Sequence, residues 1–223
     1  MTADKEVLFI HIPKCAGVSI SQALRKRVGL TTHGPHFKCK HLFHPNGDLE
    51  QANYFIFTFV RNPWERLVST FYYIMNGGRV EIDARRRDLY LSKYQGDFKK
   101  FVLDIENWID IREDDRIYPD QFIPHFRPQF EYILDDQGNK MVDFIGRFEN
   151  IKDDFRSLCA ALSVDVVKLP TSNRSSHGRY HKYYDHKTME IVADFYAKDI
   201  ELFNYQFSKV RPRLGDIFSF GRR

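Results

Sequence analysis

The chain has 223 residues, of which 43% are hydrophobic, 15% aromatic and 29% charged, and its formal net charge is +4. This composition is typical of a folded globular protein and excludes disordered and collagen-like chains, and the length suits one domain over residues 1–223. The positive excess is too small to indicate nucleic-acid binding, and neither a basic helix nor zinc-finger spacing supports it. A mildly basic chain does suit an anionic cofactor or an acidic acceptor.

Three cysteines, Cys15, Cys39 and Cys159, lie far apart and form no CxxC pair. This argues against a disulfide scaffold and against a zinc site. The first six residues are mostly polar and lead directly into an apolar stretch, without a leader-like region or a run long enough to span a membrane. We therefore expect a cytoplasmic protein with no membrane segment and no bound metal.

Residues 7–12, V-L-F-I-H-I, form the apolar, β-branched run that is typical of a buried parallel strand. A short loop with Lys14 and Gly17 follows, and residues 20–27 then have helical character. This order of strand, loop and helix creates an anion site, because free N–H groups at a helix N-terminus point at the ligand and the helix dipole favours negative charge. Lys14 adds a full positive charge to the loop.

The loop differs from the Walker A motif, in which a lysine directly follows the last glycine. Here Lys14 precedes Gly17, and Ser19 follows it. The order P-K-C-A-G-V-S resembles the 5′-phosphosulphate loop of sulfotransferases, which often reads P-K-T-A-G-T-S. The donor in that family is 3′-phosphoadenosine-5′-phosphosulphate (PAPS), and its product is 3′-phosphoadenosine 5′-phosphate (PAP). The resemblance implies that the donor's 5′-phosphate is bound by Lys14, Cys15, Ala16, Gly17, Val18 and Ser19.

A second motif follows another aromatic, β-branched run at residues 54–60. Arg61 comes directly after this predicted strand, at the end where open α/β sheets bind ligands. Ser69 lies in the next predicted helix, and an arginine fork with a hydroxyl is suited to a terminal phosphate. The sequence F-V-R-N-P-W-E-R-L-V-S resembles the 3′-phosphate motif of the same sulfotransferases, which assigns Arg61 and Ser69 to the donor's 3′-phosphate.

The loop departs from the family pattern at Cys15 and Val18, where threonine is usual. Two hydroxyls are lost, so backbone N–H groups, Lys14 and Ser19 must hold the 5′-phosphate. A cysteine in an electropositive loop is also a candidate reactive thiol, although sulphuryl transfer needs no thiol nucleophile.

Four histidines, His33, His36, His41 and His44, gather before the second motif. We expect residues 36–43 to form a short strand between two turn signals. The spacing does not match a metal site. In the resembled carbohydrate sulfotransferases, the general base can be a histidine just before the strand that leads to the arginine motif, which favours His41, with His36 as the alternative.

The rest of the chain reads as helices and loops. Residues 79–128 are expected to shape the acceptor site, with core packing as the simpler role for Tyr118, Gln121, His125 and Gln129. In the resembled family a late loop covers the adenine and the 3′-phosphate, which implies roles for Ser176, Arg179 and Tyr180. The other predicted elements are a helix at 64–76 ending at Gly77-Gly78, a helix at 97–107, a hairpin at 132–142, a strand at 142–148, and helices at 151–162 and 188–205.

These patterns predict an α/β three-layer sandwich with a central, mainly parallel sheet, and the resemblance implies the P-loop-nucleotide-hydrolase-like sulfotransferase fold. It also implies PAPS-dependent transfer of a sulphuryl group to a hydroxyl or amine of a small-molecule or glycan acceptor, with Lys14 and His41 as catalytic residues. Two alternatives stay open. One is a P-loop kinase or NTPase, which the misplaced lysine disfavours, and the other is a catalytically silent nucleotide-binding protein.

Overall fold

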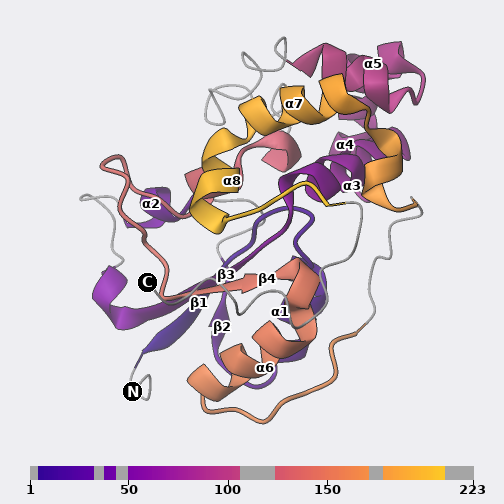
Figure 1. The fold of residues 1–223 in the computed structure, drawn as a ribbon. Helices are drawn as coiled ribbons and strands as arrows, with labels where there is room; N and C mark the ends of the chain where they lie inside the picture. Colours follow the sequence, from indigo (N-terminus) through magenta and orange to yellow (C-terminus); the bar gives the residue numbers. More distant parts are fainter. Residues whose placement is uncertain (1–4, 33–37, 44–49, 106–123, 171–177, 209–223) are drawn as a thin grey trace.

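The computed structural model describes residues 5–32, 38–43, 50–105, 124–170 and 178–208. A four-stranded sheet in the order β2-β1-β3-β4 lies at its centre (Figure 1). The strands are β1 (Glu6–Ile10), β2 (Leu30–Thr31), β3 (Tyr54–Val60) and β4 (Phe144–Arg147). All three pairings are parallel, which confirms the predicted parallel sheet.

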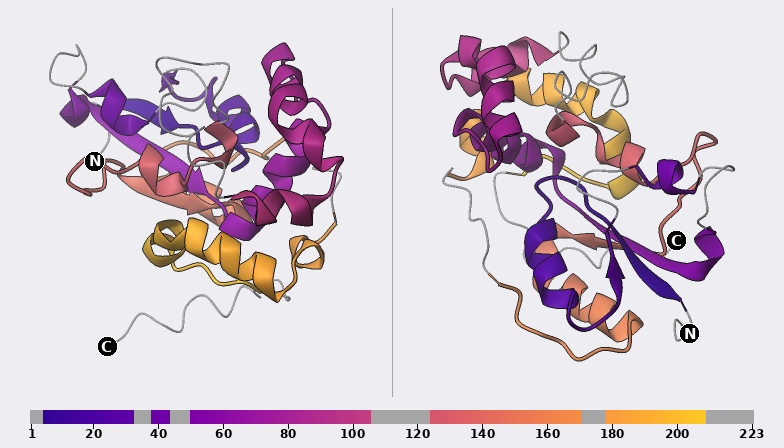
Figure 2. Two further views of the ribbon diagram at one scale, coloured as in Figure 1. Left: turned by 90° about the horizontal axis from the view of Figure 1, so that it is seen from above. Right: turned by 180° about the vertical axis from the view of Figure 1, so that it is seen from behind.

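Helices cover the sheet on two sides (Figures 1 and 2). Helices α1 and α6 lie side by side below the sheet in Figure 1, and α3, α4, α5, α7 and α8 form a group above it. This arrangement confirms the predicted three-layer α/β architecture. The helix bounds are α1 (Gly17–Leu24), α2 (Cys39–Leu42), α3 (Pro63–Met75), α4 (Glu81–Arg86), α5 (Phe98–Leu103), α6 (Ile151–Ala161), α7 (His186–Phe195) and α8 (Ala197–Phe203), and a π-helical turn spans Arg87–Leu91.

The two central strands, β1 and β3, are apolar along nearly their whole length because both faces of the sheet are covered. Leu8, Ile56 and Phe57 are fully buried in the main hydrophobic cluster. Near the carboxyl ends of these strands, the Thr58 hydroxyl donates a hydrogen bond of 2.7 Å to the carbonyl of Ile10. The loops that follow β1 and β3 therefore start next to each other, and these loops carry Lys14 and Arg61.

Helix α3 carries the second motif and has a clear start and end. The Asn62 side chain accepts a hydrogen bond from the Glu65 amide, and Pro63 occupies the first turn, where its missing N–H has no cost. At the other end Gly77 and Gly78 have positive φ, and the Gly78 amide donates to the Tyr73 carbonyl at 2.9 Å. This glycine ending is the one expected from the sequence.

A second hydrophobic cluster lies outside the sheet, among the upper helices. Helices α3, α5 and α7 pack on one another there through Phe71, Phe101 and Val192, all of them buried. The cluster is rich in aromatic edge contacts, such as that between Phe71 and Phe98. It fixes the direction of α3 relative to the sheet, and with it the position of every α3 side chain that faces the loops.

Two predictions about secondary structure are wrong. In the segment 36–43, residues Cys39–Leu42 form helix α2 instead of a strand, because Leu30–Thr31 takes the place beside β1 and the buried Cys39 thiol contacts the Met141 carbonyl at 3.7 Å. The single helix expected at 188–205 is two helices that meet at Tyr196. The buried Tyr196 donates its hydroxyl to the Phe126 carbonyl at 2.7 Å, which anchors the chain at this break.

Other elements follow the sequence more closely. Helix α5 follows its N-cap Asp97 and ends at Leu103, so it is shorter than the predicted helix at 97–107, of which residues 106 and 107 lie outside the described residues. The predicted hairpin is a tight turn closed by one bridge between Leu134 and Lys140. Among the described residues, no helix is long and apolar enough to cross a membrane. The assignment of residues 1–223 to one domain stays a prediction.

Candidate functional site

The loop after β1 has the backbone of an anion-binding turn. Lys14 and Ala16 adopt left-handed conformations with φ of 66° and 65°, which non-glycine residues seldom do. Helix α1 then starts at Gly17, with the Ile20 amide bonded to the Ala16 carbonyl at 3.1 Å. The loop therefore directs free N–H groups of a helix N-terminus towards the carboxyl edge of the sheet.

Gly17 is required by packing against the preceding strand. A Cβ at this position would lie 2.0 Å from Cδ2 of His11. His11 itself stacks on Phe9, and burial followed by the nearby Lys14 charge lowers its pKa to about 4. The imidazole beneath the loop is therefore neutral at physiological pH and serves as packing.

Arg61 joins the two motifs into one site. Its Nη1 donates to the backbone carbonyl of Lys14 at 3.1 Å, and its Nη2 pairs with Oε1 of Glu65 at 3.1 Å. The guanidinium lies over the Phe148 ring at 4.0 Å from its centroid and is almost completely buried. Among the described residues its Nε is buried without a hydrogen-bond partner. A buried cation with an unused donor is well suited to an anionic ligand.

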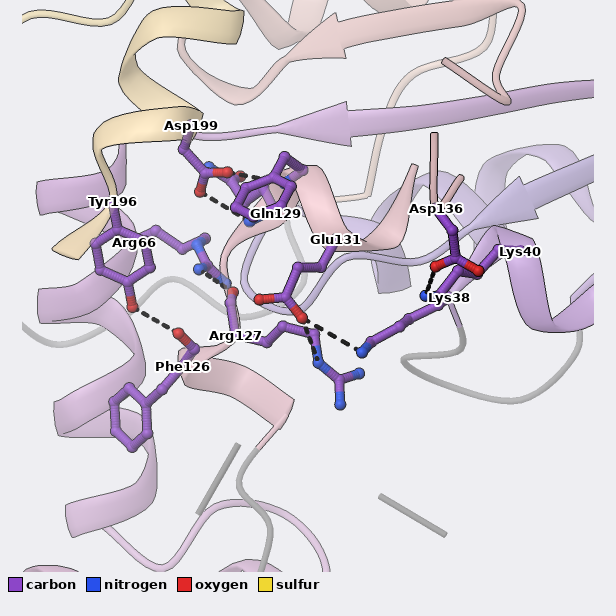
Figure 3. Close-up of polar contacts among 11 residues, drawn as sticks. Lys38, Lys40, Arg66, Phe126, Arg127, Gln129, Glu131, Asp136, Tyr196 and Asp199 are labelled. Carbon is purple, nitrogen blue, oxygen red and sulfur yellow. Dashed lines mark hydrogen bonds and ion pairs between the residues drawn. The ribbon is translucent and has the colours of Figure 1, made fainter. Parts of the chain in front are cut away.

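Gln129 connects the loop after β1 with the loop after β3, and the sequence analysis did not predict this role. Its side-chain oxygen accepts from the Arg61 amide at 2.8 Å and from the Cys15 thiol at 3.4 Å. Its backbone amide donates to Oδ2 of Asp199 at 2.8 Å (Figure 3). The Gln129 side chain is fully buried, so it fixes the loops and does not line the acceptor site. No local sequence signal marks this contact.

The same segment is fastened by buried Arg66 on α3 (Figure 3). Its Nη1 donates to the carbonyl of His125 at 3.1 Å and its Nη2 to that of Arg127 at 2.5 Å. Arg127 in turn pairs with Glu131 at 3.6 Å. These contacts position the residues just before Gln129 against α3.

The Lys14 ammonium lies close to α3. Its Nζ is 3.9 Å from the centroid of the Tyr73 ring. Burial, together with the charges of Arg61 and Arg79, lowers the pKa of Lys14 to about 8, although Asp83 acts in the opposite direction. A bound polyanion would stabilise this partly desolvated ammonium and would reduce its repulsion by the two guanidiniums.

Cys15 has a structural role. Burial raises the pKa of its thiol to about 12, so it is not the activated thiolate that an electropositive loop can produce. Its Sγ contacts the carbonyl of Pro13 at 3.6 Å as well as Gln129. The thiol is therefore used for contacts inside the protein.

The remaining motif residues differ in exposure. Ser19 on α1 and Ser69 on α3 are buried, whereas Val18 is 36% exposed. Val18 therefore presents its side chain outwards, so only its backbone N–H is suited to an anion bound in the loop.

The late loop comes close to the Arg61 motif. Tyr180 exchanges hydrogen bonds with the backbone of Ser208, at 2.8 and 2.9 Å, and its ring packs on Phe207. Phe207 packs on Trp64 in the first turn of α3. Tyr180 is thus near the start of α3, while Arg179 beside it is exposed and Ser176 lies outside the described residues.

His41 lies in α2 and is exposed. This helix is attached to the 134–140 turn, because Lys40 pairs with Asp136 and Cys39 contacts Met141. Lys38, which directly precedes α2, pairs with Glu131 at 3.3 Å (Figure 3), and this contact brings the start of α2 towards the Gln129 segment. His33, His36 and His44 lie outside the described residues, as do Tyr118 and Gln121, and the role of His41 stays a prediction.

Metal ligands do not gather in the part of the chain that the structure describes: no group of three or more His, Cys, Asp or Glu side chains there is arranged to hold an ion. The site's chemistry is that of cations and N–H groups around Lys14 and Arg61.

Comparison with known proteins agrees with this chemistry. A family model described as "Sulfotransferase family" matches residues 1–206. Searches of curated proteins and of solved structures gave no significant match. The family match spans both motifs and nearly all of the described residues, and the chain therefore belongs to the sulfotransferase family.

Proposed function

We propose that the protein transfers the sulphuryl group of PAPS to a hydroxyl or amine of a carbohydrate or hydroxylated small molecule. The observation that carries this proposal is the bond between the Arg61 guanidinium and the Lys14 carbonyl. This bond joins the loop that resembles a 5′-phosphosulphate loop to a buried arginine, and this supports a single donor site. Family membership supports sulphuryl transfer in general.

The donor's two phosphate groups match two parts of this site. Backbone N–H groups of the loop, with Lys14 and Ser19, would hold the 5′-phosphosulphate. Arg61, whose Nε is buried without a partner among the described residues, would hold the 3′-phosphate with Ser69. Arg179, Tyr180 and Ser176 would cover the adenine and the 3′-phosphate.

In-line displacement leaves negative charge on the departing phosphate oxygen. Lys14 and the loop N–H groups would stabilise that charge, the role that Mg²⁺ has in phosphoryl transfer from ATP. Holding both substrates in line would provide much of the remaining rate.

The acceptor must also lose a proton as it attacks, which is a task for a general base such as histidine. We propose His41 for this role and His36 as the alternative. His11 has a pKa of about 4, so it takes up a proton only at a pH well below that at which an ordinary histidine base becomes protonated. We further propose that the protein acts in the cytoplasm.

Calorimetric titration tests the donor. PAP is expected to bind tightly and ADP and ATP far more weakly, because Arg61 offers a second phosphate site apart from the loop. Equal affinity for PAP and ADP would favour the kinase or NTPase alternative. A protein that binds PAP but transfers no label from PAPS to any acceptor in a broad screen would be the silent nucleotide-binding protein.

Replacing the base tests the mechanism. His41→Ala is expected to lower turnover on the order of 10²–10⁴-fold and to leave PAP affinity nearly unchanged, since the base meets only the acceptor. The acidic limb of kcat/KM should disappear as well. The matched control is His186→Ala, which removes an exposed histidine paired with Glu190 on α7. If His41→Ala keeps both its activity and its acidic limb, the base is His36, His33 or a carboxylate from residues 79–128, and His36 is the next residue to replace.

A further inference from the structure

We propose that Tyr73, anchored by Asp83, is a positioning residue for Lys14: its aromatic face holds the Lys14 ammonium at the place where it meets the donor. The proposal rests on the proposed function and adds a residue that neither motif contains. Tyr73 lies near the end of α3, well beyond the Arg61 motif at its start.

The contact between ammonium and ring is close. Nζ of Lys14 lies 3.9 Å from the Tyr73 ring centroid, well within the range in which the negative face of the ring attracts a cation. Because Lys14 is only partly exposed, less water competes for its ammonium, and the ring face replaces part of its hydration. A long lysine side chain on a left-handed residue has many rotamers, and this contact selects one of them.

The ring is itself held firmly. The Tyr73 hydroxyl donates to Oδ2 of Asp83 at 2.6 Å, and the ring of His125 packs against it at 5.2 Å. Asp83 is buried, and it also accepts the Arg79 amide at 3.2 Å and lies 3.8 Å from Nη1 of Arg86. Tyr73 is thus fixed at its hydroxyl and along its ring.

The glycine turn after α3 makes this anchor possible. Gly78 has φ of 62°, and a Cβ there would lie 2.1 Å from Cβ of Asp83 and 2.3 Å from its Oδ2. Only glycine lets the Asp83 carboxylate approach the turn so closely. The Gly77-Gly78 ending of α3 therefore serves the site as well as the helix.

Several charged or titratable groups face Lys14: Arg61 after β3, Arg79 in the glycine turn, Asp83 on α4, and His11 and Cys15 in its own segment. Arg61 and Arg79 repel the ammonium, and both lower its pKa. The electron-rich face of Tyr73 and the carboxylate of Asp83 counter this repulsion, so they keep the ammonium charged and in the site before the donor arrives.

The test combines kinetics with NMR of ¹³C-labelled lysine in the full chain. Tyr73→Leu keeps an apolar neighbour and removes the ring face. It is expected to lower kcat on the order of tenfold and the pKa of Lys14 by about half a unit, with PAP affinity changed by less than about threefold. Tyr73→Phe keeps the face and should restore the Lys14 pKa and most of kcat.

The matched control is Tyr94→Leu, because Tyr94 also donates to an aspartate, Asp104, and lies beside a lysine. This variant should leave the Lys14 pKa unchanged. Should Tyr73→Leu not fold, Tyr73→Met fills a similar volume without a π face and replaces it in the test.

A ring-less variant with wild-type kcat and an unmoved Lys14 titration would overturn the proposal. The NMR readout needs no turnover, so it decides the role of Tyr73 even if PAP fails to bind and the proposed function is wrong.

Discussion

Two groups of the same three residue types occur in this chain, and they behave differently. Lys14, Tyr73 and Asp83 come from a loop, α3 and α4, whereas Lys93, Tyr94 and Asp104 are close in sequence. In both groups the tyrosine donates to the aspartate and the lysine lies near the ring, at 3.9 Å in the first and 4.9 Å in the second.

Their environments separate them. The Lys93 side chain is 60% exposed and pairs with Asp104 at 2.8 Å, and this hydrogen bond raises its pKa. Burial and two arginines instead lower the pKa of Lys14 to about 8. Residue types alone therefore do not indicate which lysine is a candidate for function. Burial, neighbouring positive charge and a loop at a helix N-terminus indicate Lys14 as that candidate.

Within this comparison, the largest effect is expected from replacing each of the two lysines. Lys14→Ala should lower kcat on the order of 10²–10³-fold, because in the proposed mechanism it removes the charge that would face the departing oxygen. It should also loosen PAPS, since the ammonium meets the donor's ground state. Lys93→Ala should keep kcat within about twofold, as expected for an exposed pair. Steady-state kinetics on both variants, with thermal unfolding as the check on folding, would measure this, and equal losses would remove the distinction.

Arg61→Ala should have the next largest effect. Donor binding is expected to weaken by about 2–4 kcal/mol, the cost of an unmade charge-assisted contact. Since Arg61 also lowers the pKa of Lys14, that pKa should rise in the variant. Calorimetry with PAP measures the affinity, and Arg156→Ala, which removes an exposed pair with Asp153 on α6, is the control. Wild-type affinity in Arg61→Ala would contradict the 3′-phosphate assignment.

The pH dependence of activity should be smaller but diagnostic. Above a pKa of about 8, free enzyme loses the Lys14 charge, so kcat/KM should fall about tenfold per pH unit. Bound phosphates favour the ammonium, so the limb in kcat should lie at higher pH. A rate profile from pH 7 to 10 tests this, and an alkaline limb that persists in Lys14→Ala would assign it to another group.

Folding stability should change with pH in the same window. The folded pKa of Lys14, about 8, lies below its ordinary value of 10.5. The unfolded chain therefore binds more protons between these values, and this group's contribution to stability rises as the pH increases from about 8 to 10.5. Below pH 8 its burial costs stability in full. Denaturant melts at several pH values between about 8 and 10.5 give the free energy of unfolding. This free energy should rise more steeply with pH in the wild type than in Lys14→Met.

The smallest effect is expected for the free energy of unfolding when the exposed pair of Lys93 and Asp104 is removed. Lys93→Ala should change the free energy of unfolding by less than about 1 kcal/mol, and added salt should reduce the difference further. A larger, salt-independent change in a urea melt would mean that this pair is not the surface contact that its exposure indicates.

The sequence by itself determined the sheet strands β1, β3 and β4, the helix α3 with its glycine ending, and the two motifs that resemble those of sulfotransferases. These features depend on local information: apolar runs with β-branched residues, capping and turn residues, and motif order. Such signals survive because each is complete within about a dozen neighbouring residues. The motifs also identified Lys14 and Arg61, although not the bond that joins them.

Only the tertiary structure decided what depends on contacts between distant segments. Residues 39–42 became a helix because Leu30–Thr31 paired with β1, and the last predicted helix divided at Tyr196 because its hydroxyl reaches Phe126. Gln129 and Tyr73 have no local signal, since their importance comes from Arg61 and Lys14, many residues away along the chain. Burial and the distances between charged side chains are properties of the packed molecule. They make Lys14, and not Lys93, a candidate for catalysis.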